Sequence, residues 1–367
     1  MIALRLAAKG HLEAESVVAR LVCTKRADQQ ASLERDYRLC FEENGWAHFA
    51  KDSHTIVIKS KSDSLDGDVV MLPAGGTTAH RLIRANSKHN SLLVTEQCDQ
   101  LCVMCSQPPK AKHNDMFSAF VLACMLAPRH SVIGITGGEP LLYKHQIFAL
   151  VMQVHQERPD ISFHILTNGQ HFCSHDVDVL SSSAFDNVLW AIPVYSHEAC
   201  LHNKIVGKPG AFENLLITFD ILSRTAAQIE LRTVLMQSNQ QQMPELANFL
   251  TQHIPFASQW SIMQMERIGY GRMNWSQEFY DSSEDFGSVG RALSIGNGRG
   301  LDTRLFNFPL CTIPFKYQRY AVSSISDWKR KFENFCDGCN LQSSCGGFFE
   351  WYSHDSGFKK VGHHEEA

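Results

Sequence analysis

Strand-like and helix-like stretches alternate along the chain from Ser91 to about Met265, and this alternation restricts the fold more than any other feature. Segments with one apolar helical face separate the strand candidates, as in Tyr143–Glu157, where apolar residues recur three and four positions apart. Such an order predicts an α/β protein with a parallel sheet and right-handed crossovers. Six units are too few to close an eight-unit barrel, so we expect a partial (β/α)6 barrel. Its strands are predicted to begin near Leu92, Val132, Ile161, Val188, Glu230 and Gln259.

The remainder of the chain flanks this region. Residues 1–90 contain short β-type runs separated by turn clusters, which predict a small β-rich N-terminal domain. Residues 91–272 would form the partial barrel, and residues 273–367 a cysteine-rich C-terminal domain. The polar, glycine-rich stretch Asp281–Gly300 is expected to be a flexible loop.

Charge and hydropathy argue against several classes of function. The net charge of −4 gives no electrostatic footprint for nucleic acid. No apolar run reaches the roughly 18 residues that a membrane span needs, and Glu13 and Glu15 make the N-terminus a poor signal peptide. We therefore expect a cytoplasmic protein that binds neither nucleic acid nor membrane. Twelve cysteines are many for a reducing compartment, and they indicate metal binding rather than disulfides.

Three cysteines lie close together just after the first strand candidate. Cys98, Cys102 and Cys105 have the spacing C-x3-C-x2-C. Thiolates this close in one loop can hold a soft metal centre. A structural zinc site normally needs four ligands, whereas a 4Fe-4S cluster held by three thiolates keeps one iron open. The alternatives are a zinc site with a missing ligand, disulfides, and unrelated buried thiols.

Glycine and polar residues end the next two strands. Gly137-Gly138-Glu139-Pro140 follows the second strand, where paired glycines let the backbone approach a ligand and Pro140 fixes the turn. Taken alone, the same residues could be an ordinary tight loop between strand and helix. Asn168 ends the third strand, either as a ligand-binding side chain or as a turn residue.

The cysteine loop resembles the signature of the radical SAM enzymes. The Gly-Gly-Glu-Pro turn, one unit later, is similar to the motif whose backbone holds the methionyl amino group in that superfamily. The resemblance implies a partial barrel of the radical SAM type, with a 4Fe-4S cluster and S-adenosyl-L-methionine (SAM) as cofactors. In that family the open iron chelates the amino and carboxylate groups of SAM, and one electron from the cluster releases a 5′-deoxyadenosyl radical.

The same resemblance implies roles for individual residues. Cys98, Cys102 and Cys105 would be the metal ligands of the radical SAM cluster. Arg232 is one of the expected SAM-binding residues, but an arginine in a barrel could equally neutralise a structural carboxylate. No catalytic side chain is identified. Met104 stands where relatives carry an aromatic residue, and its sulfur can pack against an adenine ring. The residues expected to bind SAM are Met104, Gly137, Gly138, Glu139, Asn168, Ser196 and Arg232.

A second group of cysteines lies near the C-terminus. Cys336, Cys339 and Cys345 have the spacing C-x2-C-x5-C, which resembles the core of the SPASM or twitch domains of peptide-modifying radical SAM enzymes. A two-cluster pattern would have another cysteine at Phe349, so the resemblance implies one auxiliary 4Fe-4S cluster, with Cys311 as its fourth ligand. A zinc knuckle and an auxiliary cluster with an open site are the alternatives.

The motifs between about residues 86 and 350 together resemble the radical SAM maturase of the His-Xaa-Ser repeat peptide system. The stretch from His202 to Phe212 is also similar to a segment of radical SAM peptide maturases, with Asn203 in place of an acidic residue. The resemblance implies a ribosomal peptide substrate, a companion radical SAM protein, and an external one-electron reductant such as flavodoxin or ferredoxin. Two alternatives are a radical SAM enzyme that acts on a small molecule or nucleobase, and an iron–sulfur electron carrier or zinc-binding adaptor.

Overall fold

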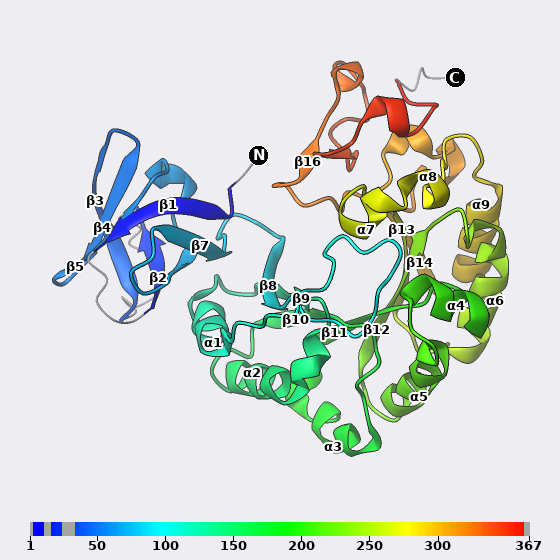
Figure 1. Ribbon diagram of the computed structural model, residues 1–367, viewed down its shortest axis with the longest axis horizontal. Coiled ribbons are helices and arrows are strands. Elements are labelled where there is room, and N and C mark those ends of the chain that lie inside the picture. Colours follow the sequence, from blue (N-terminus) through cyan, green and yellow to red (C-terminus); the bar gives the residue numbers. More distant parts are fainter. Residues whose placement is uncertain (1–2, 11–15, 24–33, 363–367) are drawn as a thin grey trace.

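The structure is a computed structural model, and it describes residues 3–10, 16–23 and 34–362. The N-terminal part is a closed seven-stranded barrel (Figure 1) with the strand order β1-β5-β4-β3-β2-β6-β7. Apolar side chains such as Leu21, Phe49 and Ile56 fill its interior, so the expected β-rich segment has a core of its own. The strands are β1 Arg5–Gly10, β2 Val17–Val22, β3 Asp36–Glu43, β4 Trp46–Lys51, β5 His54–Ile58, β6 Val69–Leu72 and β7 Thr78–Ile83.

The largest element is an open sheet of eight strands in the order of the sequence, and every neighbouring pair in it is parallel. The prediction of an α/β protein with a parallel sheet is therefore confirmed. The first six strands begin within two residues of the expected positions, and two more strands extend the sheet. They are β8 Asn90–Thr95, β9 Val132–Gly137, β10 Ser162–Leu166, β11 Val188–Pro193, β12 Gln228–Leu235, β13 Gln259–Gln264, β14 Asp302–Phe306 and β15 Ala321–Val322.

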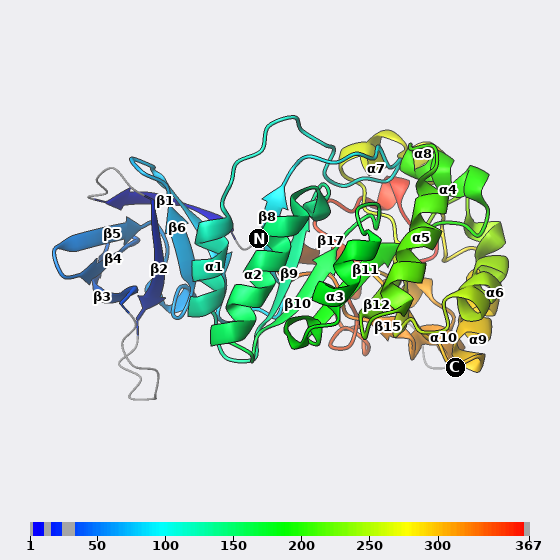
Figure 2. The same cartoon turned by 90° about the horizontal axis from the view of Figure 1, so that it is seen from below.

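Helices cover one face of this sheet (Figure 2). Alternate side chains of the strands, such as Ile165, Trp190 and Trp260, are fully buried in the main core, which the helices share. Most helices connect successive strands, as right-handed crossovers require. They are α1 Phe117–Leu126, α2 Lys144–Glu157, α3 Val177–Leu180, α4 Ala199–Val206, α5 Ala211–Ser223, α6 Met243–His253, α7 Gly269–Met273, α8 Trp275–Glu278, α9 Gly287–Gly298 and α10 Phe315–Gln318.

The other face of the sheet carries polar side chains. His164, Glu230, Arg232 and Ser261 alternate with the core residues of β10, β12 and β13. Glu230 accepts hydrogen bonds from Ser261 and pairs with His164, whose Nε2 lies 2.6 Å from Oε2 of Glu230. Figure 1 places the C-terminal segment, in orange and red, on this side of the sheet, away from α1 to α6. The C-terminal segment thus lies on the side of the sheet that carries these polar residues.

The prediction of a flexible loop at Asp281–Gly300 is wrong, because most of this stretch forms helix α9. Val289, Ala292 and Leu293 occupy one face of that helix and are fully buried. Two of its glycines are positions of close packing: a Cβ at Gly290 would lie 2.6 Å from the hydroxyl oxygen of Tyr317, and one at Gly296 would lie 3.1 Å from Cβ of Thr303. These two glycines therefore let α9 pack closely against its neighbours.

The C-terminal segment beyond β15 contains little regular structure. Its only described sheet pairs β16 Arg330–Lys331 with β17 Phe348–Phe349 in antiparallel orientation. An ion pair between Arg84 and Asp327 links it to the chain just after the N-terminal barrel. The domain boundaries at residues 90 and 272 stay predictions. None of the helices in the described ranges combines the length and apolar character needed to cross a membrane.

Candidate functional site

The cysteine loop lies at the C-terminal edge of the parallel sheet, directly after β8. Its backbone is held by hydrogen bonds to the end of α4: the N–H groups of Leu101 and Val103 donate to the carbonyl oxygens of Val206 and Ile205, each at 2.9 Å. The carboxyl ends of parallel strands are where α/β proteins place their ligands. The loop is thus fixed at the edge of the sheet where function is expected.

The three thiols of this loop are partly buried and act on one another. Burial raises the pKa of Cys98 to about 11, and the charge of Cys105 adds to the effect. Burial and the charges of Cys105 and Cys98 hold the pKa of Cys102 well above its usual range. Mutually raised pKa values disfavour thiolates unless a cation compensates them. All twelve cysteines are unpaired, so disulfides do not account for the loop.

The glycines of the Gly-Gly-Glu-Pro turn pack against the cysteine loop itself. The N–H of Gly138 donates to the carbonyl oxygen of Thr95, and the N–H of Glu139 to that of Gln97, both at 2.8 Å. A Cβ at Gly138 would lie 2.6 Å from the carbonyl carbon of Gln97 and 3.0 Å from Cβ of Cys98. Close backbone approach is therefore needed at this position whether or not a ligand lies beside it.

Glu139 fastens the same turn to β10. Its carboxylate is fully buried and accepts hydrogen bonds from the N–H of Leu141 at 2.8 Å, the hydroxyl of Thr167 at 2.6 Å, and the N–H of Asn168. Burial raises the pKa of Glu139 to about 7, although these hydrogen bonds work to lower it. The side chain and the N–H of Glu139 are thus both bound by protein groups, which fixes the turn between the cysteine loop and the end of β10.

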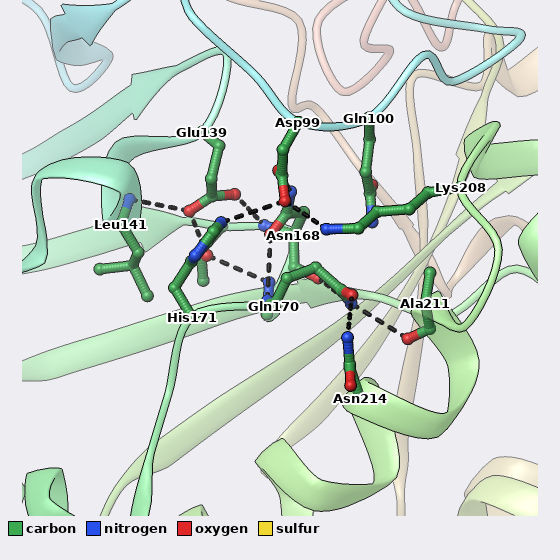
Figure 3. A network of polar contacts seen from close by, with 12 residues as sticks. Asp99, Gln100, Glu139, Leu141, Asn168, Gln170, His171, Lys208, Ala211 and Asn214 are labelled. Carbon is green, nitrogen blue, oxygen red and sulfur yellow. Dashed lines mark hydrogen bonds and ion pairs between the residues drawn. The ribbon is translucent and has the colours of Figure 1, made fainter.

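Asp99, inside the cysteine loop, is the centre of a polar network that the sequence did not reveal (Figure 3). Its carboxylate accepts a hydrogen bond from Nδ2 of Asn168 at 2.7 Å, pairs with Lys208, and lies 3.3 Å from Nε2 of His171. Burial works to raise the pKa of Asp99, but the nearby His171 imidazole and the contacts with Lys208 and Asn168 hold it well below its usual range. Asp99 therefore ties the cysteine loop to the loops after β10 and α4.

The other residues expected to bind SAM lie in different surroundings. Asn168 is committed to Asp99, whereas Ser196 is buried and donates to Oε1 of Gln242 at 2.9 Å. Arg232 lies on the polar face, where its Nη1 is 3.5 Å from Oε2 of Glu230. Of the expected set, the structure brings Gly137, Gly138, Glu139 and Asn168 to the cysteine loop.

Met104 is buried in a small apolar cluster beside the cysteine loop, together with Tyr195, Met236 and Met265. Burial raises the pKa of Tyr195 far above its usual range, and the charges of Cys102 and Arg232 also act on its hydroxyl. Tyr195, shortly after β11, thus belongs to the same apolar cluster as Met104. Its position at the end of a strand was the only signal of this in the sequence.

The C-terminal cysteines gather in one place, although Cys311 is separated in the sequence from the other three. Cys311, Cys336, Cys339 and Cys345 all line a single cavity, together with Phe348. Burial raises the pKa of Cys311 to about 11, and the charges of Cys345 and Cys336 add to the effect. The sulfur of Cys345 accepts hydrogen bonds from the N–H groups of Leu310 and Gly347 at 3.3 Å.

In the described ranges no three His, Cys, Asp or Glu residues are arranged to hold one metal ion. Both groups of cysteines offer the soft sulfur donors that iron–sulfur clusters use. The donor set of soft thiolates therefore fits an iron–sulfur cluster in its chemistry at both places.

No protein-family model matches the chain, and no curated protein matches it in sequence. Streptococcus suis SuiB bound to S-adenosylmethionine is similar over 59% of this chain and 49% of SuiB, with a TM-score of 0.48 and 16% identity. SuiB bound to the precursor peptide SuiA is similar with a TM-score of 0.47, 16% identity, and coverage of 59% and 48%. A radical SAM methyltransferase from Sphaerobacter thermophilus has a TM-score of 0.45 and 14% identity, with 65% of this chain and 72% of that chain covered.

The cysteine loop and the Gly-Gly-Glu-Pro turn resemble motifs of radical SAM proteins. A radical SAM protein is also among the solved structures to which this chain is similar. The chain spans about half the length of SuiB. Because these TM-scores are all below 0.5, we infer function from the residues of this chain.

Proposed function

We propose that this chain is a radical SAM enzyme that modifies a ribosomally synthesised peptide of the His-Xaa-Ser repeat type. One observation carries the proposal: three mutually adjacent thiols lie at the C-terminal edge of a parallel sheet, with the Gly-Gly-Glu-Pro backbone hydrogen-bonded to their loop. A redox-inert structural site would normally offer four ligands, and this loop offers three. The resemblance of the motifs between about residues 86 and 350 to the His-Xaa-Ser maturase supports a peptide as the substrate.

Cys98, Cys102 and Cys105 would hold the 4Fe-4S cluster. When bound, the cluster and SAM supply reductive cleavage of the sulfonium and a 5′-deoxyadenosyl radical able to abstract hydrogen from the substrate. The protein's part is to fix the geometry: Asp99 anchors the cysteine loop to the loops after β10 and α4, and Glu139 anchors the turn to the residues that follow β10. Supporting hydrogen bonds of this kind hold reacting groups precisely enough for chemistry.

Water exclusion is the second contribution of these residues. The apolar cluster of Met104, Tyr195, Met236 and Met265 packs against Cys102 and Val103 of the cysteine loop. A dry surrounding protects a carbon radical from side reactions and strengthens the polar contacts that orient the substrate. The resemblance supports backbone contacts of Gly137 and Gly138 with the methionyl end of SAM, and contacts of Ser196 and Arg232 farther along the cofactor.

The C-terminal cysteines extend the proposal. Cys311, Cys336, Cys339 and Cys345 would hold one auxiliary 4Fe-4S cluster, supported by their common cavity. Residues 273–367 would then be an auxiliary-cluster domain, following the barrel at 91–272 and the N-terminal domain at 1–90. An external one-electron reductant, a companion radical SAM protein and a reducing, cytoplasmic setting belong to the same proposal.

Peptide modification is tested by mass spectrometry of a His-Xaa-Ser repeat peptide co-expressed with the protein. We expect a mass change with the wild type and none with Cys105→Ala, because the radical source is lost. Cys200→Ala is the matched control, since Cys200 is exposed on α4 and outside both cysteine groups. An unchanged peptide with a wild-type protein that carries its full iron content would refute the peptide as substrate.

A further inference from the structure

A recess opens next to the cysteine loop, between the loop from β13 to α7 and the C-terminal segment. Its floor rests on the cysteine loop: a Cβ at Gly269 would lie 2.5 Å from the carbonyl oxygen of Cys105. The N–H of Tyr270 donates to that same oxygen at 2.8 Å. The recess is lined by Arg267, Ile268, Gly269, Arg272 and Trp351.

The polar groups of this recess are hydrogen-bond donors without partners. Nε of Arg267 and Nε1 of Trp351 are buried, and neither finds a partner within the described chain. The side chain of Arg272 is exposed and forms no ion pair with any described residue. Guanidinium and indole N–H groups cannot accept hydrogen bonds, so the recess requires an acceptor from outside.

Charge in the recess points the same way. Glu266, next to Arg267 in the sequence, is already paired with Lys329 and does not neutralise the arginines. The guanidinium of Arg267 lies 5.9 Å from the centroid of the Trp275 ring, a contact that holds its position without removing its charge. Two arginines and a tryptophan with a buried, unpartnered indole N–H therefore line one recess.

We propose that this recess binds a carboxylate of the peptide substrate, an inference that rests on the proposed peptide-modifying function. A carboxylate offers acceptor sites on two oxygens and pairs with arginine in a planar, bidentate geometry. It would satisfy both unpartnered donors and neutralise the local charge. A carboxylate held there would place the adjoining residues of the peptide beside the cysteine loop.

The neighbouring cavity explains why the carboxylate belongs to a peptide rather than to a free anion. Arg267 and Trp351 also line an aromatic cavity with Phe348, Phe349 and Phe358. Phe348 in turn lines the cavity of the C-terminal cysteines. The apolar walls of this cavity suit the peptide residues that flank the bound carboxylate. Through Phe348, the cavity also adjoins the cavity of the C-terminal cysteines.

The proposal is tested by fluorescence anisotropy with labelled peptides and the anaerobically prepared holoprotein. One peptide has three His-Glu-Ser repeats and the other three His-Gln-Ser repeats, both with an amidated C-terminus. A third, the His-Gln-Ser peptide with a free C-terminal carboxylate, distinguishes a terminal carboxylate from a side-chain carboxylate. The same preparations are reduced in the presence of SAM and assayed for 5′-deoxyadenosine, which tests the proposed function separately.

We expect one of the two carboxylate-bearing peptides to bind the wild type about tenfold or more tightly than the amidated His-Gln-Ser peptide, as a charge-assisted pair implies. Arg267→Gln/Arg272→Gln should bring that ratio close to one. Arg272→Gln alone, at an exposed position, should lower it partly without risk to folding. Arg129→Gln is the matched control, because Arg129 is exposed just before β9, at the opposite edge of the sheet, and should keep the ratio.

Equal affinity of the wild type for all three peptides, or binding of none, would overturn the carboxylate site. So would a ratio that survives in the double variant or falls equally in Arg129→Gln, since the effect would then be one of overall charge. If SAM is cleaved while the peptides are not distinguished, the recess is refuted and the radical SAM function stands. If carboxylates are distinguished but SAM is not cleaved, the site stands and the proposed function fails.

Discussion

A methyl group at Gly138 should displace the cysteine loop. In the structure its Cβ would lie 2.6 Å from the carbonyl carbon of Gln97 and 3.0 Å from Cβ of Cys98. The carbonyl carbon of Gln97 is part of the loop backbone and Cβ of Cys98 is bonded directly to that backbone, so neither can yield as the far end of a flexible side chain could. Overpacking of this kind costs about 1–3 kcal/mol, and here the strain falls on Cys98.

The assay for Gly138→Ala is iron per chain after anaerobic reconstitution, together with the free energy of unfolding in urea. We expect the variant to lose iron equivalent to one cluster, roughly four atoms, and to unfold more easily than the wild type. Gly298→Ala is the matched control, since a Cβ there has nothing within 4 Å. Because alanine favours the helix, that variant should be neutral or slightly more stable. Full iron content and wild-type stability in Gly138→Ala would refute the reasoning.

Three further predictions follow from the site. Asp99→Ala should destabilise the protein by about 1–3 kcal/mol and weaken iron retention in the presence of a chelator, because Lys208 and Asn168 lose their partner. Asp178→Ala, on α3, is the control. Equal iron loss in both variants would contradict the role of Asp99. Burial lowers the pKa of His202 from 6.5 to about 4. As the pH falls, the unfolded chain therefore takes up a proton at this histidine before the folded chain does. Folding stability is lost between pH 6.5 and about 4, by at most about 1.4 kcal/mol per pH unit. Urea denaturation of His202→Gln at pH 7, 6 and 5 should be less pH-dependent than that of the wild type, and an unchanged slope would assign the effect elsewhere. Cys336→Ala/Cys339→Ala/Cys345→Ala should still cleave SAM but yield no modified peptide, and a loss of zinc instead of iron on metal analysis would make the site a structural knuckle.

The strands and the order of the sheet could be predicted because their signals are local. Each of the six expected strands is a short apolar run bounded by turn residues, and parallel crossovers follow from the alternation with helices. Helix α9 could not be predicted in the same way. Glycine has a low helix propensity. The role of Gly290 and Gly296 in α9 depends on Tyr317 and on Thr303 in β14, which pack against them.

The features of the site also differ in whether they are local in the sequence or depend on contacts between distant segments. The cysteine spacing and the Gly-Gly-Glu-Pro turn are contiguous in sequence, so their chemistry could be inferred, whereas Asp99 acquires its partners from loops after β10 and α4. Nothing near Asp99 in the sequence indicates that Lys208 will reach it. The recess at Arg267 depends likewise on Trp351, contributed by a distant part of the chain. Contacts between remote segments, and not residue types, were the missing information.

The central claim is that Cys98, Cys102 and Cys105 support cleavage of SAM. The most direct measurement is 5′-deoxyadenosine formed per chain after anaerobic reconstitution and reduction with dithionite, compared among the wild type, Cys102→Ala and Cys200→Ala. We predict 5′-deoxyadenosine from the wild type and from Cys200→Ala, and none from Cys102→Ala, because a cluster held by two thiolates of this loop is not retained. Wild-type amounts of 5′-deoxyadenosine from Cys102→Ala, or none from an iron-replete wild type, would contradict the claim.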